Sequence, residues 1–242
     1  MNNIPHLIIL FTCALSLSCA KAQLHLSYYC DAGRNNVSEG LYIKTSLSGI
    51  YKYKKNKFET GGCIDIYSNI DNNCPGFFFD YSREFSVKKK AVEIHGFYLY
   101  NRFSGFLFES DKGVYLKLYR THFFCEFGTF FRKYGFTGNG KEKYNIDNDD
   151  EVHENFNLMY SFSYFIKPPD HKWNAGVALT NMDHYLINVE TNPVFNLQAR
   201  YNPGNSLVVF AEAWYRSAGA FNLSVSTFGF FFRTGVIWKT GV

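Results

Sequence analysis

Charged side chains recur at alternate positions in segments that are otherwise rich in apolar residues. Glu212 and Arg216, for example, are four residues apart and share one face of a predicted strand. Charges of both signs that face one enclosed space could select ions or small solutes, or could form ion pairs that fill the space. On the strand parity of the sequence, the inward-facing charged residues are Lys44, Lys52, Glu59, Asp65, Lys117, Glu126, Arg132, Arg200, Glu212, Arg216 and Arg233.

Histidines and carboxylates could also support acid–base or metal chemistry. The sequence has no His-Glu-x-x-His motif, no Cys-x-x-Cys motif and no histidine pair at ligand spacing. His122 and Glu126 share a strand face, and an acidic stretch at 147–150 precedes His153. A hydrogen bond on the inward strand face accounts for the first feature. A solvated acidic loop accounts for the second. We therefore predict no catalytic residues, no metal ligands, no cofactor and no enzymatic activity.

The elements that must position these residues are strands, because apolar and polar residues alternate with a period of two. Segments 41–53, 156–166, 195–202 and 207–216 all show this pattern. A soluble barrel would turn its apolar face inward, whereas a membrane barrel turns it outward. Aromatic residues at the ends of the apolar faces, polar faces rich in Ser, Asn and Gln, and segments of about ten residues favour the membrane barrel.

Turn signals divide the chain into about ten antiparallel strands. Short turns are expected at 54–57, 109–113, 168–171 and 202–205, and longer connections at 31–39, 68–75 and 136–154, with a tighter one near 217–220. Segment 77–90 is either a further strand or part of a long folded loop. Twelve strands are the alternative if it is a strand and another segment also splits. The ten expected strands are 24–31, 40–54, 57–67, 91–108, 113–134, 152–167, 172–184, 191–202, 206–217 and 221–239.

The first 22 residues resemble a secretory signal peptide. Their apolar run at 7–17 is too short to span a bilayer, and Ala20-Lys21-Ala22 fits a cleavage site. The mature chain is therefore expected to be a single domain, 23–242. It has no apolar stretch approaching 18 residues, so no transmembrane helix is predicted. The net charge of +4 is too small to indicate a nucleic-acid partner.

Four cysteines remain in the mature chain, an even number that permits disulfides in an oxidising compartment. Cys63 and Cys74 flank a polar segment, and a bond between them could staple a surface loop. Four reduced thiols are the alternative.

The mature chain resembles the outer-membrane β-barrel class of Gram-negative bacteria. Its last strand is similar to the C-terminal assembly signal of that class, since residues 229–238 alternate on one face and end on Trp238, although four more residues follow here. The resemblance implies a closed transmembrane barrel in the outer membrane. It also implies contact with outer-membrane lipid, delivery to the barrel-assembly machinery through the last strand, and possible surface ligands at extracellular loops.

The function predicted from the sequence is a narrow passive channel or a structural and surface-interaction protein. Two alternatives stay open. The class includes outer-membrane lipid hydrolases, acyltransferases and rim proteases, which would require a converging Ser, His and Asp cluster. A soluble periplasmic ligand-binding barrel would require the Phe-rich faces to point inward.

Overall fold

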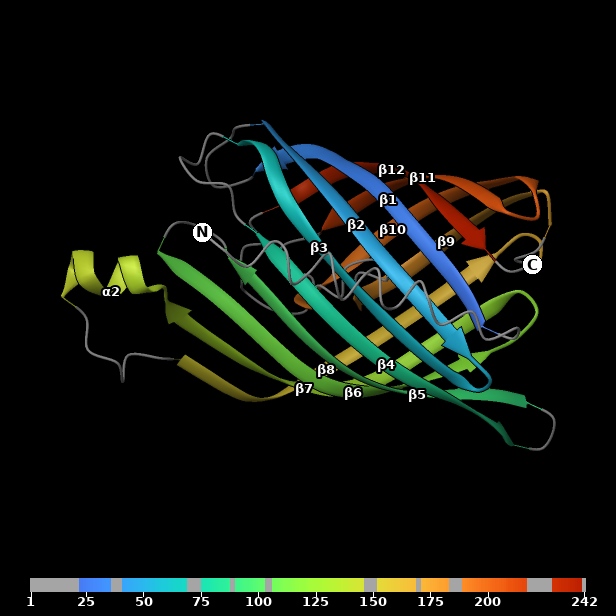
Figure 1. The fold of residues 1–242 in the computed structure, drawn as a ribbon, viewed down its shortest axis with the longest axis horizontal. Helices are drawn as coiled ribbons and strands as arrows, with labels where there is room; N and C mark the ends of the chain where they lie inside the picture. Colours follow the sequence, from blue (N-terminus) through green and yellow to red (C-terminus); the bar gives the residue numbers. More distant parts are fainter. Residues whose placement is uncertain are drawn as a thin grey trace.

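In the computed structural model of this chain, apolar side chains cover most of the outer face of the barrel wall, and the inner face carries both charged and apolar side chains. The structure describes residues 22–35, 41–68, 75–87, 90–102, 106–145, 152–168, 171–182, 189–216 and 228–240. These residues form a closed antiparallel barrel in which each strand pairs with its sequence neighbours and β12 pairs with β1 (Figure 1). The predicted all-β closed barrel is thereby confirmed.

The described part of the chain contains twelve strands and one short helix. Their bounds are β1 (Ala22–Asn35), β2 (Leu41–Tyr53), β3 (Asn56–Ser68), β4 (Gly76–Val87), β5 (Lys90–Arg102), β6 (Leu107–Tyr119), β7 (Phe123–Phe136), α2 (Gly138–Tyr144), β8 (Val152–Phe165), β9 (Trp173–Met182), β10 (Val189–Gly204), β11 (Leu207–Arg216) and β12 (Phe228–Thr240).

The expectation of about ten strands was wrong, and the alternative of twelve is correct. Residues 77–87 of segment 77–90 belong to strand β4, and the single strand expected at 113–134 is divided between β6 and β7, which form a hairpin. The turn expected at 109–113 lies inside β6, where Glu109 and Asp111 are buried and face Arg132. Judged by its polarity alone, an inward-facing acidic residue of a strand looks like an acidic residue of a turn.

The β1–β2 connection is also shorter than expected. β1 continues to Asn35, so Asp31 belongs to the wall and not to a loop. Connections at 69–74 and 217–227 lie outside the described residues, and so do residues 1–21 of the signal peptide predicted at 1–22.

The two faces of the wall have opposite character. On β4, Phe77 and Phe79 are exposed on the outer surface, whereas Phe78 and Asp80 are buried inside. The same parity holds on β12, where Phe230 and Phe232 face outward. An apolar outer surface around an interior with buried charges is the arrangement of a membrane-spanning barrel and the inverse of a soluble one.

The ends of the barrel differ in their connections. Tight turns such as those at 54–55, 120–122 and 205–206 lie at the end where β1 begins and β12 ends, which we call the short-turn end. The longer connections lie at the opposite end, the loop end, where α2 projects beyond the wall (Figure 1).

Thr137 caps α2 by accepting a hydrogen bond from the Gly140 amide at 3.3 Å. None of the described helices is long and apolar enough to cross a membrane.

Gly128 allows two strands to pack closely on the inner face. A Cβ at this position would collide with the Cβ of Tyr115 and with the backbone oxygen of Val114 on β6. Gly96, on the outer face of β5, would place a Cβ in open space.

We predict that Gly128→Ala lowers the free energy of unfolding by about 1–3 kcal/mol, because the added methyl group must displace backbone. Gly96→Ala, the matched control, should change it by no more than about 0.5 kcal/mol. Urea titration of the folded barrel in lipid vesicles measures both. Equal effects of the two substitutions would contradict the close packing at Gly128.

Candidate functional site

A buried ion pair joins the first and last strands inside the barrel. Asp31 and Arg233 are direct partners across the β1–β12 pair. The Arg233 Nε donates to Asp31 Oδ1 at 2.7 Å and its Nη2 donates to Oδ2 at 2.8 Å, so the contact is bidentate. Glu212 faces Arg233 from β11 and accepts a hydrogen bond from Trp214 Nε1 at 2.8 Å. The guanidinium also lies 4.4 Å from the ring centroid of Tyr29.

A second buried arginine lies toward the loop end of the opposite wall. Arg132 on β7 is 2.8 Å from Glu109 Oε1 and 3.1 Å from Asp111 Oδ1. Glu154 lies further away, at 4.0 Å. One guanidinium therefore serves two buried carboxylates from β6, which is possible because an arginine offers five donors in a planar fork.

Ion pairs of lysine and glutamate lie toward the short-turn end. Lys57 Nζ is 2.8 Å from Glu59 Oε2 on β3. Lys117 on β6 is 2.7 Å from Glu126 Oε1 on β7, directly across the strand pair. Both carboxylates are buried, and both lysines are partly exposed.

His95 lies among these ion pairs and is held at both ring nitrogens. Its Nδ1 is 2.8 Å from Asp80 Oδ1, and its Nε2 is 3.0 Å from Glu93 Oε2. Each ring nitrogen therefore faces a carboxylate oxygen, which accepts hydrogen bonds when the carboxylate is ionised. Tyr115 stacks on the ring with centroids 4.2 Å apart, and its hydroxyl donates to Asp80 at 3.2 Å.

An apolar belt separates the charges at the two ends of the lumen. On β5, the inward side chains change from Glu93 and His95 to Phe97 and Leu99 as the strand runs toward the loop end. The belt takes side chains from walls on all sides of the barrel, and each is at most 7% exposed: Tyr29, Cys63, Phe78, Phe97, Leu99, Tyr115, Phe130, Met159, Met182 and Phe210. Water therefore has little access to the middle of the lumen.

The charged residues selected from the sequence are distributed among these groups. Five are buried inside the barrel: Glu59, Glu126, Arg132, Glu212 and Arg233. Five are partly exposed: Lys44, Lys52, Asp65, Lys117 and Arg200. The side chain of Arg216 lies outside the described set. Cys74 also lies outside it, so the disulfide between Cys63 and Cys74 stays a prediction. The functional role of the whole set also stays a prediction.

Sequence reasoning missed several interior residues, for two reasons. Asp31, Lys57, Glu109 and Asp111 were assigned to connections because of their polarity. Asp80 lay in a segment without a firm strand assignment. In both cases the signal was the strand parity, because Asp31 lies on the same strand face as Tyr29 and Asp80 on the same face as Phe78.

The structure does not bring His122 together with Glu126, the acid selected with it from the sequence. His122 Nδ1 lies 3.2 Å from the backbone oxygen of Phe165, and Glu126 pairs with Lys117 instead. His153 is exposed on β8, and residues 146–151 lie outside the described set. Where the structure places side chains, no group of three or more His, Cys, Asp and Glu could hold a metal ion.

Comparisons with known proteins identify the fold. No protein-family model matches the chain, and no curated protein sequence does. A solved structure of the KdgM porin in complex with disordered oligogalacturonate is similar, with a TM-score of 0.50 and 10% identity over 88% of this chain and 98% of the porin. The chain has the fold of bacterial outer-membrane β-barrels.

Two further solved structures have the same kind of barrel at lower similarity. An outer-membrane channel from Pseudomonas putida F1 has a TM-score of 0.47, with 10% identity over 90% of this chain and 95% of the channel. Outer-membrane phospholipase A from Escherichia coli has a TM-score of 0.46, with 8% identity over 89% of this chain and 95% of the enzyme. At such identities the likeness concerns the fold alone.

We predict that Arg233→Ala lowers the free energy of unfolding by about 3–5 kcal/mol, because it leaves the Asp31 carboxylate buried without its partner. The double variant Asp31→Leu with Arg233→Met removes both charges and should recover most of the loss. Arg83→Ala, at an exposed arginine of β4, is the control and should cost no more than about 0.5 kcal/mol. Urea midpoints in vesicles measure all three. A loss at Arg233 as small as that at Arg83 would show that the pair does not secure the closing strands.

Proposed function

We propose that the chain is a non-enzymatic outer-membrane barrel that is closed at rest and that acts as a structural and surface-interaction protein. In this proposal residues 1–22 are removed on export, and the mature chain 23–242 spans the outer membrane. The short turns then face the periplasm and the longer connections face outward, where they could meet a surface ligand. The outward-facing apolar residues of β12 would engage the assembly machinery.

The observation that carries this proposal is the apolar belt. Lumen-facing side chains of an open pore are wetted, yet Tyr29, Leu99, Phe130 and Met159 are all 0% exposed. Acidic residues on both sides of the belt are equally inaccessible, since Asp111 is 0% and Glu126 is 1% exposed. A charged solute crossing the belt would have to shed much of its water among mainly aromatic and aliphatic side chains, which costs several kcal/mol.

A narrow passive channel is the second candidate from the sequence. It is supported by the partly exposed lysines at the short-turn end, Lys52, Lys57 and Lys117, which would attract anions toward the lumen. A channel would require the belt to open. The soluble ligand-binding barrel is not supported, because the outer surface is rich in exposed Phe, Leu, Ile and Val side chains and the interior holds buried charges.

We expect planar bilayers containing the refolded mature chain to stay silent across salt gradients. Phe130→Ala with Phe210→Ala removes two belt rings and should produce steady openings, because water and ions could then enter the belt. Phe127→Ala with Phe131→Ala removes two outward-facing rings of β7 and should leave the bilayer silent. Steady ion-selective openings of the unmodified barrel would overturn the closed-lumen proposal and support the channel.

The absence of an enzymatic role is proposed from the surroundings of His95. Ser82 is its direct cross-strand partner and Asp80 binds its Nδ1, so the three residue types of a hydrolase are adjacent. However, Glu93 occupies the Nε2. With a carboxylate on each nitrogen, the ring has no free lone pair to accept the proton of the serine hydroxyl.

We expect no turnover of phospholipid or peptide substrates by the folded mature barrel. His95→Gln, His122→Ala and His153→Ala should leave the background rate unchanged, because none of these histidines has the geometry of a general base. Fluorogenic phospholipid and peptide assays on folded, heat-modifiable protein measure this. Turnover that disappears in any one of the three variants would establish an enzyme.

A further inference from the structure

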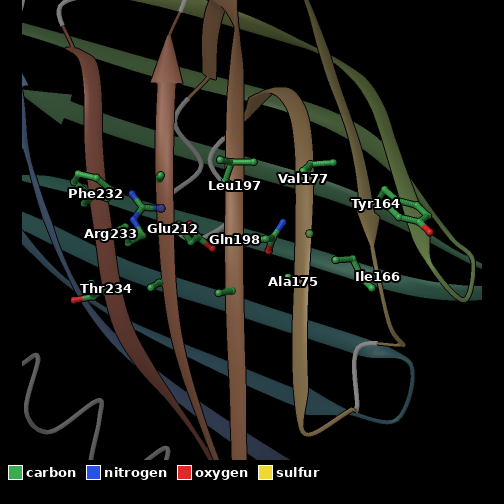
Figure 2. A pocket seen from close by; sticks show the side chains of 14 residues that line it. Tyr164, Ile166, Ala175, Val177, Leu197, Gln198, Glu212, Phe232, Arg233 and Thr234 are labelled. Carbon is green, nitrogen blue, oxygen red and sulfur yellow. The ribbon is translucent and has the colours of Figure 1, made fainter.

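The outer surface of the barrel contains an apolar groove across β8 to β12. Its volume is about 450 Å³, and it lies between Tyr164 and Ile166 at one end and Phe232 and Thr234 at the other (Figure 2). The side chains that line the groove on the outer surface, such as Tyr164, Leu197 and Phe232, point away from the lumen. In a membrane this groove is open to lipid and not to water.

A row of small residues forms the floor of the groove. Ala175, Ala199, Ala211 and Thr234 are successive cross-strand partners on β9, β10, β11 and β12. The residues on either side of this row are mostly larger. On the side toward the loop end, the row Tyr164, Val177, Leu197, Ala213 and Phe232 follows the same strands; on the side toward the short-turn end, it is Trp173, Tyr201, Val209 and Val236. The small residues therefore lie at the bottom of a groove that runs across the strands, and we call this groove the trench.

The trench leads from the rim of the barrel into the membrane-spanning wall. It begins at Ile166, just beyond the end of β8, where the Ile166 amide donates to the Ala175 oxygen at 2.9 Å. It reaches Thr234, which is six residues before the end of β12 at Thr240. Strands lie about 4.8 Å apart, so crossing from β8 to β12 takes roughly 19 Å. This length is comparable to one leaflet of a hydrocarbon core that is about 30 Å thick.

Cationic and aromatic residues gather at the rim end of the trench. Lys167 follows Ile166 directly, and Lys172 lies on the other side of the same β8–β9 turn; both are exposed. Trp173 and Tyr201 stack with ring centroids 4.1 Å apart, and such amphipathic rings favour the headgroup level of a membrane. The rim thus offers positive charge where the headgroup of a lipid in the trench would lie.

We propose that the trench is a binding site for an anionic phospholipid of the leaflet on the short-turn side. One acyl chain lies along the alanine floor, and the phosphate contacts Lys167 and Lys172. The inference rests on the membrane placement proposed above. A lipid suits the site better than a second barrel, because the trench starts beside two lysines and a symmetric interface would bring like charges together.

Native mass spectrometry of the folded mature barrel, titrated with phosphatidylglycerol or phosphatidylcholine, tests the site. The unmodified barrel should retain one phosphatidylglycerol in preference to phosphatidylcholine. Ala199→Leu with Ala211→Leu fills the floor and should weaken phosphatidylglycerol retention at least tenfold. Lys167→Gln with Lys172→Gln should abolish the preference for the anionic lipid.

Matched controls place comparable changes elsewhere on the wall. Thr60→Leu enlarges an exposed, outward-facing residue of β3, and Lys54→Gln with Lys55→Gln neutralises the exposed lysines of the β2–β3 turn. Both should leave lipid retention unchanged, with folding verified by heat-modifiable mobility. Retention that is insensitive to the two alanine substitutions would overturn the proposal.

A dimer that the alanine substitutions dissociate would identify a second copy as the occupant and would also overturn it. Conductance by the unmodified barrel would refute the closed lumen without changing lipid retention, so the two failures can be told apart.

Discussion

The pairing of β1 with β12 removes the free edges of the sheet, and the other features of the molecule depend on this closure. A sheet in hydrocarbon must satisfy every backbone amide and carbonyl within itself, because no water is present to do so. The closing pair is reinforced inside by the bidentate contact of Arg233 with Asp31. This contact joins residues that are 202 positions apart in the chain, so it forms only where the first and last strands meet.

Closure divides the side chains into two populations with opposite requirements. Most outward-facing side chains are apolar, as contact with lipid requires, and the inward-facing charges that are buried from water must find partners. The ion pairs toward the two ends of the lumen meet this requirement. The belt between them is filled by aromatic and aliphatic side chains, and the close approach at Gly128 permits part of that packing. The interior therefore resembles a protein core with polar ends more than it resembles a water-filled pore.

The proposed lipid site follows from the same division. Large outward-facing side chains cover most of the wall, and a trench arises where alanines align across three adjacent strands. That alignment is invisible within any one strand, because Ala175, Ala199 and Ala211 are far apart in sequence and meet only through the strand register. The lumen and the trench are on opposite faces of the same strands, so a surface role and a lipid contact do not compete for side chains.

The sequence by itself determined the strand period, the inverted polarity, the closed-barrel class and the parity that directs Glu126, Arg132, Glu212 and Arg233 inward. These are local properties, because alternation is fixed within each strand. Only the tertiary structure decided the number of strands, the ion-pair partners, the apolar belt and the trench. Acidic residues such as Glu109 look like turn residues until Arg132 lies opposite them, and whether a lumen is open depends on side chains from opposite walls. Both are set by register and closure, which bring together residues that the sequence keeps apart.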